Sequence, residues 1–384
     1  MASCQKPVVL IYVQHLLGIG HLRRISFLAI ALANHQFEVH LVSGGMPVSD
    51  LTATNVRLHQ LAPVRSTNGL FNELVDDNNQ PVDQPWKDRR CDALLNLFDS
   101  IEPGVLITET FPFGRRMMRF ELLPLLQKAK QKPNPPLILS SIRDILQPKQ
   151  KAQRNDEILD LIEQFYDRIL VHGDDTIATL ESTYPYAKKI AHKVHYTGYI
   201  VDPNASIDTK VMTKSEEVLV SGGGGAASLS LLRAAIEARP LSNFKDHTWR
   251  LLVGHNIDQV TFESLQQHAD LGLIIERNRS DFYSLLESCA VSISQAGYNT
   301  VMDILKAKAH SVIVPYAESG ELEQTIRTNL LQKQNRVIYI EASMLNARAL
   351  ADAVDKAAIQ PIIAKQYQMN GANNSAELIK GWLN

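Results

Sequence analysis

Apolar runs of strand length recur along the first half of the chain, and small or polar residues follow each of them. Short apolar runs bounded in this way are typical of buried strands, and the apolar spacing at 86–98 predicts a helix. Strands and helices in alternation predict a doubly wound parallel sheet, which binds ligands at the carboxyl ends of its strands. The runs lie at 8–13, 38–43, 56–61, 105–107, 137–142 and 168–171.

The same pattern restarts after residue 216 and indicates a second unit of the same class. A polar stretch with a proline at position 203 separates the two halves, as an interdomain linker does. The sequence therefore predicts an α/β chain of two Rossmann-like domains, at 1–201 and 217–384, joined by a linker at 202–216. A helix at 375–383 ends the chain and is able to cross back to the first domain. The expected strands of the second half lie at 217–220, 249–253, 271–275, 291–294, 311–315 and 337–341.

Composition narrows the classes of protein. The chain has 384 residues, of which 45% are hydrophobic and 21% charged, so two packed domains are expected. A formal net charge of −2 argues against a general nucleic-acid binder. No apolar run approaches the roughly 18 residues that cross a bilayer, and the three cysteines lack metal-type spacing. We expect a soluble, cytoplasmic protein with reduced thiols, for which contact with a membrane surface stays open.

A candidate general base follows the first strand. In Gly18-Ile19-Gly20-His21 the glycines let the chain turn from strand to helix, which brings His21 to the helix start at the sheet's binding edge. The ordinary pKa of histidine suits a general base, although a residue there can also simply cap the helix or bind water. Glu109 ends a later strand, where it could polarise His21, bind an acceptor hydroxyl or pair with an arginine.

Several arginines are expected at the same edge: Arg23, Arg24, Arg115, Arg116 and Arg143. If they gather there, they favour an acceptor with a phosphate or carboxylate group; the alternative is a set of ordinary surface arginines. The polar stretch at 64–85 is interpreted as a surface loop over the acceptor site, and His172 and His195 as structural histidines. The predicted acceptor-binding residues are Gly20, Arg24, Arg115 and Arg143.

Two glycine-containing turns in the second half are candidates for binding phosphate. One is a run of glycines that opens a helix, but it lacks the Lys-Ser/Thr of a P-loop. The other, Gln295-Ala296-Gly297, leads from the strand that ends at Ser294 to a helix from Asn299, whose N-terminal N–H groups suit a diphosphate. Asp303, one turn after Asn299, could reach a ribose. The glycine run is Gly222, Gly223, Gly224 and Gly225.

The order of the motifs in the second half resembles the donor site of GT-B glycosyltransferases, above all the peptidoglycan N-acetylglucosaminyltransferase branch and predicted bacterial glycosyltransferases related to it. The resemblance implies that the Ser-x-Ala-Gly turn contacts the diphosphate, that Asp303 holds the ribose, that Gln324 touches the donor sugar and that the segment with Arg277 lies along the nucleobase. The motifs are Ser294-Gln295-Ala296-Gly297, Thr300-Val301, Asp303, Val314-Pro315-Tyr316 and Glu323-Gln324.

The chain departs from the family pattern at two positions. Asp303 stands where Glu is usual, and Glu323-Gln324 replaces a Gln-Gln pair, which leaves the identity of the donor sugar open. The segment from Gly18 to Arg24 is also similar to nucleotide-sugar hydrolases of the pseudaminic acid pathway.

The resemblance implies a glycosyltransferase that moves a sugar from a nucleoside-diphosphate sugar, with UDP as the expected nucleotide, to a small or lipid-linked acceptor. No cofactor is expected, and no metal, because no Asp-x-Asp pair stands at a strand end. A nucleotide-sugar hydrolase that releases free sugar is the first alternative. A non-catalytic nucleotide-sugar-binding partner of another enzyme is the second.

Overall fold

The chain folds into two compact units, each of which is described by itself. The computed structural model describes residues 6–16, 19–48, 55–67, 73–147, 152–202, 215–222, 228–316, 322–362 and 366–383. The first unit comprises Met1–Asp202 together with Gln368–Asn384, and the second comprises Pro203–Tyr367. Most of the expected linker at 202–216 lies outside the described residues.

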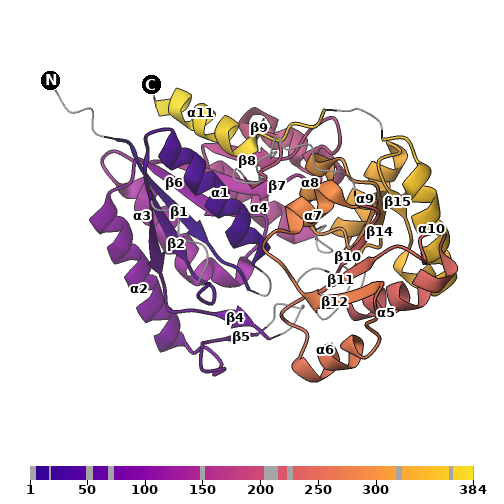
Figure 1. Cartoon of the computed structure of the whole chain (residues 1–384). Coiled ribbons are helices and arrows are strands. Elements are labelled where there is room, and N and C mark those ends of the chain that lie inside the picture. Colours follow the sequence, from indigo (N-terminus) through magenta and orange to yellow (C-terminus); the bar gives the residue numbers. More distant parts are fainter. Residues whose placement is uncertain are drawn as a thin grey trace. The chain divides into compact units, whose positions relative to one another are not determined.

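The first unit is built on a parallel sheet with strand order β3-β2-β1-β6-β7-β8-β9 (Figure 1). The order reverses between β1 and β6, and such a switch point opens a crevice at the carboxyl ends of the strands. The residues just after β1 and β6 therefore meet at one place. The strands are β1 Val8–Val13, β2 Glu38–Ser43, β3 Val56–Gln60, β6 Val105–Glu109, β7 Leu137–Arg143, β8 Arg168–His172 and β9 Val194–Tyr196.

Helices cover both faces of this sheet, because successive side chains of β1 point in opposite directions. Val9 and Ile11 belong to the core under α1 and α11. Leu10 and Tyr12 belong to the core under α2 and α3. All four side chains are fully buried, as expected for a strand in the middle of a parallel sheet. The helices are α1 Gly20–Asn34, α2 Gln84–Ile101, α3 Arg119–Gln131, α4 Ala152–Phe165 and α11 Gly371–Leu383.

The stretch at 64–85 was interpreted as a surface loop, and the structure adds detail to it. β4 (Arg65–Ser66) and β5 (Leu74–Val75) pair antiparallel within it, and Leu74 and Val75 are buried in the unit. Residues 68–72 lie outside the described part of the chain. The Ser66 N–H also donates to the Leu16 carbonyl at 3.0 Å, which ties this stretch to the segment after β1.

The C-terminal helix α11 belongs to the first unit, whereas the sequence placed 217–384 in the second domain and only allowed that helix to cross back. The Gly371 N–H donates to the Tyr199 carbonyl at 2.9 Å, and the Asn374 side chain donates to the Thr197 carbonyl at 2.8 Å. α11 also packs beside α1 (Figure 1). The chain thus returns to the first unit at residue 368.

The second unit repeats the architecture with strand order β12-β11-β10-β13-β14-β15, again parallel. Its switch point lies between β10 and β13. The strands are β10 Val218–Ser221, β11 Trp249–Val253, β12 Leu273–Arg277, β13 Val291–Ser294, β14 Ser311–Ile313 and β15 Ile338–Tyr339. The helices are α5 Leu229–Ala238, α6 Gln259–Gln266, α7 Phe282–Ser288, α8 Tyr298–Ala307, α9 Glu323–Lys333 and α10 Ala347–Ile359.

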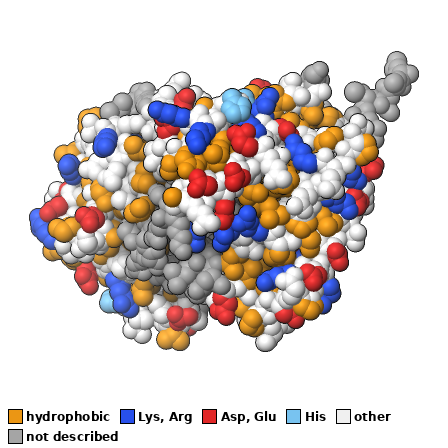
Figure 2. Space-filling view, turned by 180° about the vertical axis from the view of Figure 1, so that it is seen from behind, with side chains coloured by type: hydrophobic (Ala, Val, Ile, Leu, Met, Phe, Trp, Pro, Cys, Tyr) orange, Lys and Arg blue, Asp and Glu red, His pale blue; other side chains and the backbone are white. Residues whose placement is uncertain are grey.

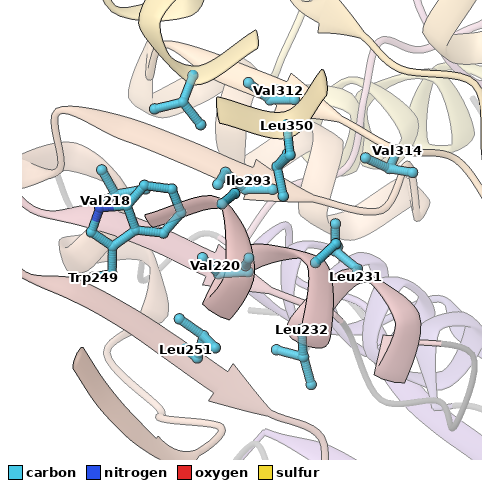
Figure 3. Close-up of a cluster of buried hydrophobic side chains, with 14 of the residues drawn as sticks. Val218, Val220, Leu231, Leu232, Trp249, Leu251, Ile293, Val312, Val314 and Leu350 are labelled. Atoms are coloured by element: carbon cyan, nitrogen blue, oxygen red, sulfur yellow. The ribbon is translucent and has the colours of Figure 1, made fainter. Parts of the chain in front are cut away.

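The core of the second unit forms between the central strands and the helices α5 and α10 (Figure 3). Trp249 is completely buried, and its indole N–H donates to the Phe244 carbonyl at 3.0 Å. Leu231 on α5 and Leu350 on α10 pack against Val220 and its neighbours. The buried strands and the apolar faces of these helices hold the end of β10 and the turn after β13 in place.

The face of the molecule seen in Figure 2 carries both signs of charge. Basic and acidic side chains are interspersed on the face seen in Figure 2, in agreement with the small net charge. Among the helices in the described part of the chain, none combines the length and hydropathy needed to cross a bilayer.

Candidate active site

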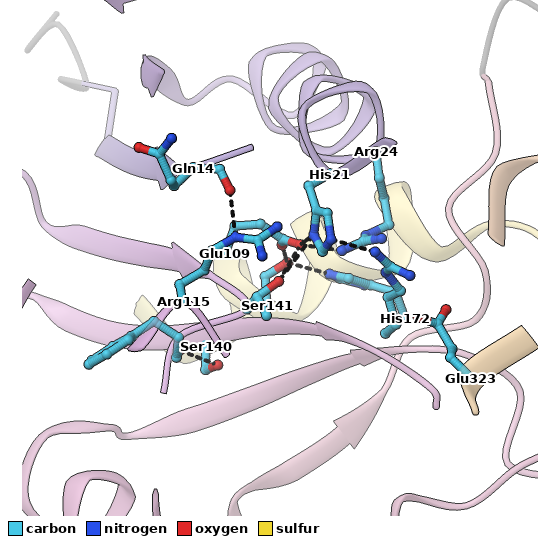
Figure 4. Close-up of polar contacts among 12 residues, drawn as sticks. Gln14, His21, Arg24, Glu109, Arg115, Ser140, Ser141, His172 and Glu323 are labelled. Atoms are coloured by element: carbon cyan, nitrogen blue, oxygen red, sulfur yellow. Dashed lines mark hydrogen bonds and ion pairs between the residues drawn. The ribbon is translucent and has the colours of Figure 1, made fainter. Parts of the chain in front are cut away.

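His21 lies at the switch point of the first unit, on the first turn of α1 (Figure 4). Its Nδ1 is 3.0 Å from Oε1 of Glu109, the last residue of β6. Arg143, the last residue of β7, directs a guanidinium N–H to Nε2 of the same ring. Since guanidinium only donates and carboxylate only accepts, the proton of the neutral ring sits on Nδ1 and the lone pair on Nε2. This is the tautomer that a general base requires.

His21 is neutral at physiological pH. Burial and the nearby cations Arg143, Arg115 and Arg24 hold its pKa well below the ordinary value of 6.5. Its side chain keeps 16% of its exposure, whereas Glu109 has none. The His21 ring is thus neutral, held in orientation by Glu109 and partly accessible to solvent.

Glu109 receives hydrogen bonds on both carboxylate oxygens. Oε1 accepts from Arg24 and from the Thr110 hydroxyl at 3.0 Å, in addition to facing His21. Oε2 accepts from the Ser141 hydroxyl at 2.7 Å. The sequence left open whether Glu109 faces His21 or pairs with an arginine, and the structure shows both.

The turn after β6 is held in a strained shape that directs these groups. Thr110 has a φ of 69°, which a β-branched residue rarely adopts. Its N–H donates to the Ser141 carbonyl at 2.8 Å, and the hydroxyls of Thr108 and Ser140 both donate to the Phe111 carbonyl. These bonds fix the turn and keep Thr110 within 3.2 Å of His21 Nδ1.

Sequence reasoning missed Ser141 and interpreted His172 as structural. His172 ends β8, and its Nε2 lies 2.9 Å from the Ser141 hydroxyl that bonds to Glu109. The signal in the sequence is the position of each polar residue at or near the end of an apolar strand. Alone, that signal does not show which strands are neighbours.

The structure brings three of the predicted acceptor-binding residues together around His21, and the fourth, Gly20, begins α1. Arg24 is buried, and Arg115 donates to the Gln14 carbonyl at 2.6 Å. Burial and neighbouring Arg143 lower the pKa of Arg115 to about 10, so it remains a cation near neutrality. Arg24 donates to Glu109, and all three arginines lie close enough to His21 to lower its pKa.

Other arginines of the predicted edge lie elsewhere. Arg116 is exposed and pairs with Glu157 at 3.3 Å, and Arg23 pairs with Asp202 at 3.7 Å. Only part of the arginine-rich sequence therefore serves the site.

A buried ion pair supports the segment after β1, which contains Gln14, the residue that binds Arg115. Arg90 and Glu121 are fully buried and form a two-pronged pair, with Nε to Oε2 at 2.8 Å and NH2 to Oε1 at 3.1 Å. Arg90 also donates to Gln14 Oε1 at 2.8 Å, and Tyr12 donates to Glu121. Sequence reasoning did not find this network, which ties α2 and α3 to the end of β1.

In the second unit, Gln324 holds the turn after β13 in place. Its Oε1 accepts from the Ala296 N–H at 3.0 Å and from the Tyr316 N–H at 3.0 Å. The side chain therefore bridges the turn after β13 and the segment after β14 through its oxygen. Ser294 is buried at the end of β13, with a hydroxyl that has no partner among the described residues.

Glu323 also has a role within the protein. It forms an ion pair with Arg327 at 2.9 Å, and Arg327 in turn donates to the Ala296 carbonyl at 3.3 Å. The N–H and the carbonyl of Ala296 are thus both hydrogen-bonded to side chains of α9, those of Gln324 and Arg327. Resemblance alone does not reveal this pair, because Arg327 lies outside the family motif.

Gly222 and Gly297 differ in whether packing within the protein requires glycine. A Cβ at Gly222 would lie 2.0 Å from the Cβ of Ser228, so close packing requires glycine there. At Gly297, the residue before α8, the nearest atom to such a Cβ is Thr300 Oγ1 at 4.0 Å. Packing does not require glycine at 297. Gly223, Gly224 and Gly225 lie outside the described residues.

The remaining predicted donor residues fall into two groups. Gln295, Asn299, Thr300 and Asp303 lie in the turn and the first part of α8, and Asp303 is buried. Arg277, by contrast, donates to the carbonyls of Gly254 and Ile257 and stacks over Phe262 at 4.0 Å. Its guanidinium fastens the loop after β11. No group of three or more His, Cys, Asp or Glu side chains in the described parts of the chain is arranged to hold a metal.

Several known proteins are similar to this chain. Residues 218–381 match the model of the glycosyltransferase family 28 C-terminal domain. A UDP-N-acetylglucosamine--N-acetylmuramyl-(pentapeptide) pyrophosphoryl-undecaprenol N-acetylglucosamine transferase from Alkaliphilus oremlandii is 23% identical over 158 residues. That match covers 39% of this chain and 41% of the relative, about two fifths of the relative's length.

Solved structures extend the likeness over the whole chain. MurG of Acinetobacter baumannii superposes with a TM-score of 0.62 at 14% identity, over 98% of this chain and 100% of that one. The calicheamicin glycosyltransferase CalG4 gives 0.64 at 12% identity, over 99% and 98%. LpCGTa in complex with UDP gives 0.63 at 14%, over 99% and 100%.

The fold is the GT-B fold, with two Rossmann-like units, as the sequence predicted. Residues 218–381 match a glycosyltransferase family model and solved glycosyltransferases share the fold over the whole chain, so the chain resembles this class of enzyme. Within that class it resembles the peptidoglycan N-acetylglucosaminyltransferase branch.

Proposed function

We propose that the protein transfers a sugar from a nucleoside-diphosphate sugar to a hydroxyl of a small or lipid-linked acceptor that carries an anionic group. The observation that carries the proposal is the pairing of neutral His21 with Glu109 at the switch point of the first unit. With Nδ1–H bound to the carboxylate, Nε2 is able to take the proton of a hydroxyl nucleophile. Glu109 then stabilises the imidazolium that forms.

The proposal that the acceptor is anionic rests on the group that binds Nε2 of His21. Arg143 donates to the very nitrogen that the base must use. A phosphate or carboxylate on the acceptor is a stronger partner for a guanidinium than a neutral imidazole is. Binding of that anion to Arg143 would therefore release Nε2 for catalysis. Arg24 and Arg115 add positive charge close to His21, which also favours an anionic group on the acceptor.

The second unit is proposed to bind the donor. The N-terminal N–H groups of α8 and its dipole suit the diphosphate, and they would stabilise its charge as the bond to the sugar breaks. Gln324 would offer its amide nitrogen to the sugar, and Asp303 would bind the ribose. UDP is proposed as the nucleotide because the curated relative is named as a UDP-N-acetylglucosamine transferase and LpCGTa binds UDP.

The proposal includes transfer without a metal ion, because helix N-termini and backbone N–H groups take the role of the cation. Treatment with EDTA is expected to leave the turnover rate unchanged. Activity that is lost with EDTA and restored by Mg²⁺ or Mn²⁺ would contradict this part of the proposal.

Binding of the donor is tested with a thermal-shift panel of UDP, dTDP, GDP, ADP and their common sugar conjugates. Ligand at about a hundredfold above its Kd stabilises the fold by roughly 2.7 kcal/mol, which is readily measured. One nucleoside diphosphate, UDP, is expected to raise the unfolding temperature. If none of the nucleotides shifts it, the donor site is wrongly assigned.

A further inference from the structure

We propose that Ser141, His172 and Thr197 form a hydrogen-bond relay that orients Glu109, which makes His172 a positioning residue for the base His21. Its effect on catalysis rests on the proposed function, but the relay itself can be observed without turnover. The relay runs sideways across the carboxyl edge of the sheet, from β6 through β7 and β8 to the residue after β9, and these strands are neighbours in the sheet.

The contacts of the relay are continuous, and Figure 4 shows those among Glu109, Ser141 and His172. The Ser141 hydroxyl is 2.7 Å from Glu109 Oε2 and 2.9 Å from His172 Nε2. His172 Nδ1 is 2.9 Å from the Thr197 hydroxyl. Each of the four side chains is at most 1% exposed. Buried polar groups in such a chain are stabilising only when every donor meets an acceptor.

The number of protons fixes the direction of the relay. An ionised Glu109 only accepts, so the single proton of the Ser141 hydroxyl points to Oε2. Ser141 then offers a lone pair to His172, which must carry its proton on Nε2. Burial and the charge of Arg24 hold the pKa of His172 well below its ordinary value, so the ring has one proton and Nδ1 accepts from Thr197.

The opposite tautomer of His172 would undo this arrangement. The Thr197 hydroxyl also lies 3.1 Å from the Gly198 carbonyl and 3.4 Å from the Val171 carbonyl, so it has other acceptors. If it turned to one of them, His172 would hold its proton on Nδ1 and Ser141 would donate to His172. Oε2 of Glu109 would then lose the Ser141 donor, which is costly for a buried carboxylate.

The orientation of Glu109 is what His21 depends on. Oε1 faces Arg24, Thr110 and His21, and Ser141 holds Oε2 from the β7 side. With both oxygens bound, the carboxylate cannot rotate, and Oε1 stays in line with Nδ1–H. Without Ser141 or the correct tautomer of His172, Oε2 has no donor from β7, the carboxylate is free to rotate, and His21 loses the alignment that fixes its own tautomer.

The kinetic test compares two substitutions at one position. Gln places an amide N–H near the position of Nε2, whereas Phe fills the space without a donor. His172→Phe is expected to lower kcat about tenfold, a part of the 10²–10⁴ that a general base contributes, with donor KM changed less than about twofold. His172→Gln should recover most of the loss. Equal defects in both variants, or full activity of His172→Phe, would overturn the proposal.

Two further readouts separate positioning from a packing defect. Ser141→Ala combined with His172→Phe should be no slower than the worse single variant, because both break one relay. The acidic limb of kcat/KM should also move to lower pH in His172→Phe, since a displaced Glu109 stabilises the His21 imidazolium less. If the losses of kcat in the two single variants multiply in the double variant, or if the acidic limb of kcat/KM does not move, the relay is contradicted. The other groups that face His21 are unchanged in these variants: Arg24, Arg115, Arg143 and His15.

A measurement on the resting protein separates failure of the relay from failure of the proposed function. Nitrogen-15 NMR of labelled histidines reports which ring nitrogen carries the proton, and the spectrum of His172→Gln assigns the His172 signals. The relay predicts His172 with its proton on Nε2 and His21 with its proton on Nδ1. A proton on Nδ1 of His172 would refute the relay even if the enzyme transfers sugar, and the predicted pattern would support it even without turnover.

Discussion

At the scale of single residues, the site sets His21 between the carboxylate of Glu109 and nearby guanidinium groups. The cations and burial lower the pKa of His21, while Glu109 holds its Nδ1 proton. The ring is therefore a weak base in the ground state that is already deprotonated at neutral pH. Its partner becomes more important in the transition state, when the ring gains charge.

Replacing His21 with Ala should lower kcat by about 10²–10⁴, because proton transfer from the acceptor then lacks its base. Donor binding should be unchanged, since the donor turn belongs to the second unit. Stopped assays with the identified donor give kcat, and the thermal-shift response gives donor binding. Substitution of exposed His192 by Ala is the control. Full turnover by the His21 variant would remove it from the mechanism.

The pH dependence of kcat/KM should show the lowered pKa of His21. Base catalysis needs the neutral ring, so activity stays constant down through pH 6.5 and falls only as the pH drops through the lower pKa. Removing a cation raises that pKa, so Arg143→Gln should move the acidic limb upward toward 6.5. Arg116→Gln, at an exposed arginine paired with Glu157, should leave it in place. A downward shift in Arg143→Gln would contradict this electrostatic account.

Residue types at strand ends predicted His21 and Glu109, because the chain order of strand, turn and helix is legible in the apolar pattern. The Ser141–His172 contact could not be predicted in this way, since it depends on β6, β7 and β8 being neighbours. The partner of Glu323 was missed for a related reason: Arg327 lies one helical turn away, but only the fold brings it under Ala296.

At the scale of elements, α11 is a helix whose existence, but not its packing partner, could be predicted from the sequence pattern. Its apolar spacing predicted a helix, and the structure begins it at Gly371, four residues earlier than 375. Its membership in the first unit comes from contacts with α1 and with the segment after β9, which no local pattern encodes. Ala372, Ala376 and Ile379 bury its apolar face in the first core.

Ile379→Ala should therefore destabilise the first unit, although residue 379 lies in the stretch assigned by sequence to the second domain. Ile379 is fully buried, and a large-to-small change in a core costs about 2–5 kcal/mol. Chemical denaturation followed by circular dichroism measures the loss. Glu377→Ala, at an exposed position on the same helix, should change stability by less than about 0.5 kcal/mol. Equal stabilities of the two variants would refute the packing described for α11.

The turn before α8 allows an equally direct test of the donor site. Gly297→Ala meets no protein atom closer than 4.0 Å, so the unfolding temperature should stay within about 2 °C of the wild type. If a diphosphate approaches this backbone, the added methyl group should weaken UDP binding about tenfold or more, as measured by calorimetry. Gly222→Ala, which clashes with Ser228, should instead lower stability. Unchanged UDP affinity in Gly297→Ala would move the diphosphate elsewhere.

At the scale of the whole molecule, each unit places its candidate residues at its own switch point. His21 and Glu109 follow β1 and β6 in the first sheet, and Gly222 and the turn from Gln295 follow β10 and β13 in the second. The alternation of strands and helices was enough to predict two such sheets. The order of their strands, and so the switch points, depends on long-range pairing that the sequence does not display.

The measurement that tests the central claim most directly is mass spectrometry of a reaction containing UDP-sugars with and without a hydroxyl acceptor that carries a phosphate or diphosphate. The account predicts that the acceptor gains the mass of one sugar, that UDP is released in equal amount and that His21→Ala abolishes both. Free sugar released at the same rate without acceptor would identify a hydrolase. If no nucleotide is released from any donor, the protein only binds nucleotide sugars, and the account is contradicted.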